Sequence, residues 1–89
     1  MTEREVKIVN RLGLHARAAA KLVHTAGAFS SQVSLLKDGE QADAKSILGV
    51  LLLAAAHGST LTIRCDGDDE ARALQAVVDL FAGRFGEDS

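Results

Sequence analysis

The chain has 89 residues, of which 47% are hydrophobic and 25% are charged, a composition typical of one globular domain over residues 1–89. A net charge of −2, only three Phe and no Trp or Tyr argue against nucleic-acid binding. The single Cys65 cannot form an internal disulfide, nothing at the N-terminus resembles a signal peptide, and the longest apolar run is too short for a bilayer. We therefore expect a cytoplasmic protein without membrane insertion.

Apolar and polar residues alternate over residues 5–9, which predicts a strand with Val6 and Ile8 on one face. After a glycine turn, residues 16–26 are rich in helix formers, and Gly27 ends this predicted helix. A second strand is predicted over residues 31–37. Asp38-Gly39 is a hairpin signal that leads into a short returning strand over residues 40–42. The helix is expected to bury Ala19, Leu22, Val23 and Ala26.

The second half of the chain predicts a helix, a strand and a last helix. Ser46 opens a helix that runs to about Leu53 and is closed by His57-Gly58. Residues 60–65 alternate as a strand, and residues 66–69, "DGDD", supply a turn and an acidic N-cap region. The last helix is predicted to bury Ala71, Leu74, Val78, Phe81 and Phe85. The order β-α-β-β-α-β-α indicates an α+β fold, an antiparallel sheet with helices on one face.

One stretch, residues 10–19 or "NRLGLHARAA", suggests chemistry. His15 stands where a helix begins, although an imidazole is a poor cap for the free N–H groups there. Those donors and the helix dipole form an anion site, and the Arg17 guanidinium suits phosphate oxygens. We expect the same positive surroundings to disfavour protonation of His15 and keep it nucleophilic. An ordinary surface histidine near a loop is the alternative, which a generic sequence would favour, and composition alone leaves the question open.

This motif resembles the active-site signature of the histidine-containing phosphocarrier (HPr) family of the phosphoenolpyruvate-dependent phosphotransferase system. Residues 45–50, "KSILGV", resemble the family's second, regulatory site. The resemblance implies an open-faced β-sandwich of four antiparallel strands under three helices. It also implies that His15 takes a phosphoryl group from enzyme I on Nδ1 and passes it to an enzyme IIA domain, with Arg17 steadying the phosphate. Ala18 stands where the family usually has proline, and we expect the helix to form despite this departure.

Residues 47–56 are apolar around most of a helical circumference, so a helix lying on a sheet would leave part of this surface exposed. The resemblance implies that Ile47, Leu48 and Leu51 dock enzyme I; a wholly buried helix is the alternative. Ser46 is expected to cap this helix. In one branch of the family this serine is phosphorylated, so the resemblance also implies that Ser46 is a regulatory site for an HPr kinase/phosphorylase, with a transcriptional regulator as a further partner.

The leading hypothesis is therefore a monomeric phosphoryl carrier, not an enzyme, in either a sugar-uptake or a nitrogen-type branch. A regulatory module that binds partners through its apolar helix is the alternative from another class, and a small hydrolase using His15 as a base is weaker. His24 and His57 lack the ligand spacing of a metal site, so no metal or cofactor is expected. Arg17, Lys21 and His24 share a helical stripe, which indicates either a basic docking face or plain solvated surface.

Overall fold

The elements of the fold follow the predicted order β-α-β-β-α-β-α. The computed structural model describes residues 1–88. It contains β1 (Thr2–Lys7), α1 (Ala16–Gly27), β2 (Gln32–Lys37), β3 (Glu40–Asp43), α2 (Ile47–Leu52), β4 (Thr60–Asp66), α3 (Glu70–Ala82) and a 3-10 turn, η1 (Arg84–Gly86). Within this described part of the chain, no helix is both long enough and apolar enough to span a bilayer.

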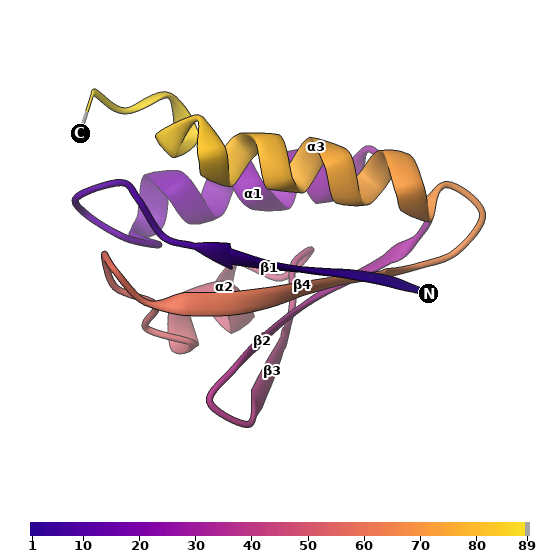
Figure 1. The fold of residues 1–89 in the computed structure, drawn as a ribbon, viewed down its shortest axis with the longest axis horizontal. Coiled ribbons are helices and arrows are strands. Elements are labelled where there is room, and N and C mark those ends of the chain that lie inside the picture. Colours follow the sequence, from indigo (N-terminus) through magenta and orange to yellow (C-terminus); the bar gives the residue numbers. More distant parts are fainter. Residues whose placement is uncertain (89) are drawn as a thin grey trace.

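The four strands form one antiparallel sheet in the order β1-β4-β2-β3. Strand β4 lies inside the sheet and buries Leu61, Ile63 and Cys65, as its alternation predicts. Their β2 partners, Val33 and Leu35, face the same side because side chains alternate along each strand. Figure 1 shows α1 and α3 running side by side along the sheet, while α2 contacts α1 and β3. The predicted open-faced arrangement is confirmed.

The β2–β3 hairpin is built by its two turn residues. Asp38 has a φ of 51° and Gly39 a φ of 82°, so both adopt the left-handed conformation of a type I′ turn. Glycine tolerates this conformation freely and aspartate better than most residues. The Asp38-Gly39 prediction is therefore confirmed, and its physical basis is backbone geometry.

The stripe predicted for the last helix is only partly confirmed: Leu74, Phe81 and Phe85 are buried as predicted, whereas Ala71 and Val78 are not. Ala71 is exposed, and Val78 lies at the half-buried flank. Apolar residues lie along two neighbouring lines on the surface of this helix, and packing against the sheet buries Ala73 and Val77 in place of Ala71 and Val78. The helix ends at Ala82, so Phe85 lies in η1, where a φ of 54° returns its ring to the Phe81 ring at a centroid distance of 4.8 Å. The residues of α3 that are buried are Ala73, Leu74, Val77 and Phe81.

Two boundaries and the buried face of α1 also differ from the predictions. Strand β1 begins at Thr2, ahead of residue 5, and Ile8 is buried just beyond its end, with its N–H donating to Ser59 O at 2.9 Å. In α1, Ala18 is buried and Val23 only half-buried. Helix α2 ends at Leu52, because Ala54 takes a φ of 51° that breaks the helix well before His57-Gly58.

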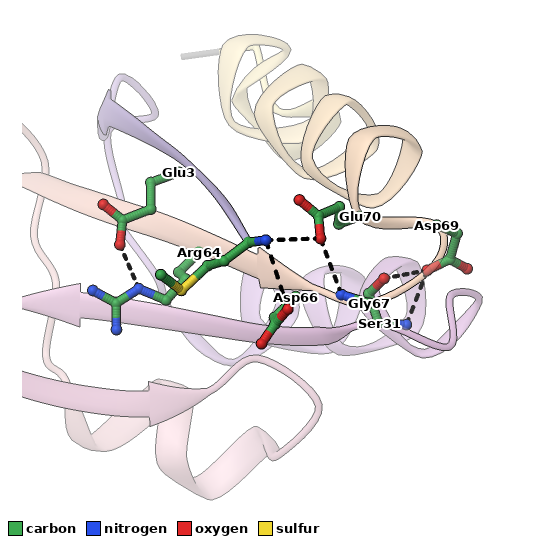
Figure 2. A network of polar contacts seen from close by, with 8 residues as sticks. Glu3, Ser31, Arg64, Asp66, Gly67, Asp69 and Glu70 are labelled. Carbon is green, nitrogen blue, oxygen red and sulfur yellow. Dashed lines mark hydrogen bonds and ion pairs between the residues drawn. The ribbon is translucent and has the colours of Figure 1, made fainter.

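Asp69 occupies the predicted N-cap position of α3, but its side chain has a different role. Its carboxylate makes no cap bond to α3 among the described residues. It accepts from the Ser30 and Ser31 N–H groups, both at 2.9 Å, and from Ser31 Oγ, as Figure 2 shows in part. These bonds, the Ser31 hydroxyl first, lower the pKa of Asp69 to about 2. Asp69 therefore joins the start of β2 to the start of α3.

Candidate functional site

The loop between β1 and α1 is held against the connection between α2 and β4. Gly13 has a φ of 66°, and a Cβ at this position would lie 2.6 Å from Ala55 O, so only glycine fits. Leu14 is buried and its N–H donates to the same Ala55 O at 2.9 Å. These contacts, rather than a proline at position 18, fix the backbone that enters α1, and Ala18 continues the helix as expected.

His15 occupies the N-cap position of α1. Its φ of −75° and ψ of 177° are extended, and its side chain makes no cap bond to the described residues. The first helical bond runs from Ala19 N to His15 O at 2.8 Å, so the N–H groups of residues 16–18 precede the intrahelical ladder. The imidazole, 27% exposed, therefore lies at the positive end of a helix, as the sequence predicted.

An open pocket of about 630 Å³ surrounds the imidazole. Two arginines, Arg11 and Arg17, contribute to its lining. The predicted pairing of His15 with Arg17 in one site is thus observed, and Arg11 adds a second cation. Charges of this sign favour an anionic ligand, and guanidinium groups match the geometry of phosphate oxygens. The complete lining is Arg11, Leu12, His15, Ala16, Arg17 and Glu87.

Glu87 contributes a negative charge to this pocket that the sequence did not reveal. The segment after α3 returns to the end of the molecule where α1 begins (Figure 1), and Glu87 Oε2 there contacts His15 Nε2. The His15 hydrogen bond, followed by one from Asn10, lowers the pKa of the Glu87 carboxyl. The expectation of purely positive surroundings is therefore wrong. A separation of 72 residues leaves no local pattern that could have signalled the contact.

The carboxylate decides how a neutral imidazole is protonated. An ionised carboxylate only accepts hydrogen bonds, so the ring nitrogen facing Glu87 must carry the hydrogen. That nitrogen is His15 Nε2. The lone pair of the neutral ring then lies on Nδ1. The site thus combines an imidazole nitrogen with a free lone pair, two arginine residues and helical N–H donors.

The basic stripe on α1 is only partly free. Arg17, Lys21 and His24 are all exposed, as expected. Lys21 Nζ nevertheless donates to Phe85 O, so this lysine anchors the turn that precedes Glu87. The stripe therefore supports the pocket in addition to presenting charge.

Ser46 is the N-cap of α2, and its Oγ accepts from Gly49 N at 3.2 Å, which confirms the capping prediction. Ile47 and Leu48 are 45% and 65% exposed, so the alternative of a wholly buried helix is wrong. Leu51, however, is half-buried against the core, and Leu52, 71% exposed, takes the outer position instead. A six-residue helix turns Leu51 inward beside Val50, so the apolar patch consists of Ile47, Leu48 and Leu52.

Across residues 1–88, no three His, Cys, Asp or Glu side chains are placed to hold a metal ion. Cys65 is a buried free thiol whose pKa is raised by burial. Neither feature adds a chemical group to the pocket.

Comparisons with known proteins match this chain over nearly its whole length. Residues 2–83 match the family described as "PTS HPr component phosphorylation site". "Phosphocarrier protein HPr" of Cupriavidus necator is 55% identical over 98% of both chains. "Phosphocarrier protein NPr" of Shewanella violacea is 41% identical over 98% of this chain and 96% of its own. The crystal structure of HPr-C-His from Thermoanaerobacter tengcongensis superposes with a TM-score of 0.97 and 44% identity, covering 100% of each chain.

Proposed function

The chain belongs to the HPr family of phosphocarrier proteins of the phosphotransferase system, and from this premise we propose that His15 accepts a phosphoryl group on Nδ1. The donor is the phosphorylated form of enzyme I, and the acceptor is an enzyme IIA domain. The protein is a carrier rather than an enzyme, because its own side chain is the intermediate. It acts as a monomer in the cytoplasm, where its one cysteine, buried and unpaired, is compatible with a reducing environment.

The contact between Glu87 and His15 Nε2 is the observation that carries this proposal. With the hydrogen held on Nε2, the Nδ1 lone pair attacks the phosphorus of the donor. The bond from phosphorus to the donor nitrogen breaks as the new N–P bond forms, and the donor nitrogen keeps the electron pair. Arg11, Arg17 and the N–H groups of residues 16–18 offset the charge of the transferred group.

The direct test is incubation of the protein with enzyme I and phosphoenolpyruvate. We expect one acid-labile phosphoryl group per chain, and none on His15→Ala, which should keep its fold because the ring lies outside the hydrophobic core. His57→Ala, which removes an exposed histidine that does not line the pocket, is the matched control and should be labelled normally. Normal labelling of His15→Ala would refute the proposal, and unfolding of that variant would instead indicate a structural histidine.

A regulatory binding module is the second candidate, favoured by the exposed apolar patch of Ile47, Leu48 and Leu52. In the carrier proposal this patch docks enzyme I, and Ser46, beside it, is phosphorylated by an HPr kinase/phosphorylase to control docking or to recruit a transcriptional regulator. A pure binding module would retain partner binding in His15→Ala and show no labelling of the wild type. To identify the branch, the labelled protein is mixed separately with a sugar-type and a nitrogen-type enzyme IIA domain. The domain that receives the phosphoryl group indicates the branch.

A further inference from the structure

Asn10 is a fully buried polar side chain between the active-site loop and the C-terminal segment. Its Nδ2 donates two hydrogen bonds, to Gly13 O at 2.8 Å and to Glu87 Oε1 at 3.0 Å. Its Oδ1 is buried and has no hydrogen-bond partner among the described residues. One amide therefore connects two parts of the chain that are 77 residues apart.

Packing alone does not call for an amide at this position. A buried oxygen without a partner loses its hydration and gains nothing in return, so it destabilises the fold. An apolar side chain of similar volume would avoid that loss. The two donor bonds of Nδ2 are what only an amide supplies here, and one of them ends on the carboxylate that contacts His15.

Glu87 needs such an anchor because regular secondary structure does not hold it. It follows η1, and its backbone is extended. A glutamate side chain has several rotatable bonds and loses considerable entropy when it is fixed. Asn10 holds Oε1, which leaves Oε2 directed at His15 Nε2. Lys21 Nζ holds Phe85 O two residues earlier, so the backbone of this segment is also anchored.

We propose that Asn10 is a positioning residue that acts through Glu87. By fixing one carboxylate oxygen it presents the other to His15 Nε2, and it thereby keeps the hydrogen of the neutral ring on Nε2 and the lone pair on Nδ1. The same relation is found at metal sites, where an outer partner of a histidine fixes its tautomer and ring orientation. The consequence for phosphoryl transfer rests on the proposed function, whereas the control of the tautomer is a property of the free protein.

The test measures the ¹⁵N chemical shifts of the His15 ring, above its titration range, without any partner protein. In the wild type we expect the hydrogen on Nε2, and in Asn10→Ala the loss of this single state to a mixture of both tautomers. Glu87→Ala should give the same mixture, and the double variant should be no different from Glu87→Ala alone. Enzyme I-dependent labelling of Asn10→Ala should slow roughly tenfold, the low end of what losing an outer-shell partner costs.

Four results would overturn the proposal. In the first, Asn10→Ala keeps the single tautomer of the wild type. In the second, Asn10→Ala changes the tautomer mixture further when Glu87 is already alanine, which would mean that Asn10 acts through the Gly13 turn and not through Glu87. In the third, the control variant Ser31→Ala, which removes a buried polar side chain beyond the opposite end of α1, gives the same mixture of His15 tautomers. The effect of Asn10→Ala would then reflect a general loss of packing. If Asn10→Ala does not fold, the proposal is tested in the wild type by the NMR signals of the Asn10 side-chain amide. These signals should change as Glu87 titrates, and amide signals that do not change are the fourth contrary result.

Failure of the proposed function has a different signature. A protein that keeps the Asn10-dependent tautomer but takes no phosphoryl group from enzyme I would refute the carrier role and leave the positioning role intact.

Discussion

At His15, two opposite electrostatic influences meet on one imidazole ring. The N-terminus of α1 and the guanidinium groups of Arg11 and Arg17 favour negative charge beside the ring, while the Glu87 carboxylate contacts its Nε2 edge. The anion-binding groups and the carboxylate therefore act on different parts of the site. A phosphoryl group on Nδ1 would meet the cations, and the carboxylate would keep its bond to Nε2–H.

Arg17 lends itself to a prediction at this scale. It lines the pocket but is not the nucleophile, and the helical N–H groups remain when its side chain is removed. A hydrogen bond to a charged group contributes about 1.5–3 kcal/mol. Arg17→Ala should therefore slow labelling by enzyme I roughly tenfold to a hundredfold without abolishing it, as measured by rapid-quench kinetics.

The control for charge alone is Arg72→Ala, which removes an exposed arginine on α3 that does not line the pocket. It should be labelled at the wild-type rate. Equal rates for Arg17→Ala and the wild type would make Arg17 simple surface charge.

Among single residues, the sequence identified His15 and Arg17, and it missed the contribution of Arg11 and the contact between Asn10 and Glu87. His15 and Arg17 are two positions apart at a recognisable helix start, so their pairing was predictable. Glu87 and the Asn10 amide meet across most of the chain, and this contact depends on where η1 returns the C-terminal segment. No periodicity or propensity encodes such a contact.

At the scale of elements, the periodicity of the sequence predicted whether each segment is a helix or a strand. It did not predict where some elements end, because those ends depend on backbone conformations that periodicity does not report. Ala54 and Phe85, both in the left-handed region, end α2 and place the last aromatic ring. Alanine and phenylalanine seldom adopt this conformation, so the sequence offered no signal there. Leu51 was assigned to the surface for a related reason, since an apolar run does not reveal which face turns inward.

Asp69 provides the prediction for this scale, because it joins the starts of β2 and α3. Its pKa falls from an ordinary 3.8 to about 2 in the folded protein, through hydrogen bonds from Ser31 and Ser30. A lowered folded pKa contributes stability that is present above the unfolded value and is lost as the pH falls through the folded value. Asp69→Asn should therefore lower Tm at neutral pH and flatten the decline of Tm between about pH 4 and pH 2.

Asp68→Asn changes an exposed acid in the same turn and is the matched control. Thermal melts across the acid range should show the wild-type slope for Asp68→Asn and a shallower one for Asp69→Asn. Equal slopes for the wild type and both variants would mean that the hydrogen bonds of Asp69 do not contribute to the pH dependence of Tm.

At the scale of the whole molecule, the active-site loop and the regulatory candidate are parts of one surface structure. Ser46 caps the start of helix α2, and the connection that follows this helix carries Ala55, whose carbonyl accepts from Leu14 N next to His15. The apolar patch of Ile47, Leu48 and Leu52 lies on the helix between these points. A partner that reaches His15 while docking on this patch must also approach Ser46.

A negative charge at Ser46 should therefore interfere with docking more than with folding. Aspartate is a good N-cap, so Ser46→Asp keeps the helix. A partner that buries Ile47 and Leu48 must desolvate the new carboxylate or face it with charge of its own, and docking weakens. We expect Ser46→Asp to slow labelling of His15 by enzyme I with little change in Tm. Ser46→Ala, which loses the bond from Gly49 N, should lower the free energy of unfolding by about 1 kcal/mol yet still accept phosphate.

Ser46→Asn separates the charge from the cap, because asparagine caps as well as aspartate but is neutral. It should match the wild type both in labelling rate and in Tm, so that only Ser46→Asp is slow and only Ser46→Ala is unstable. Labelling rates and melting curves for the three variants decide the matter. If Ser46→Asp is labelled as fast as Ser46→Asn, no electrostatic block exists, and Ser46 serves only to cap α2.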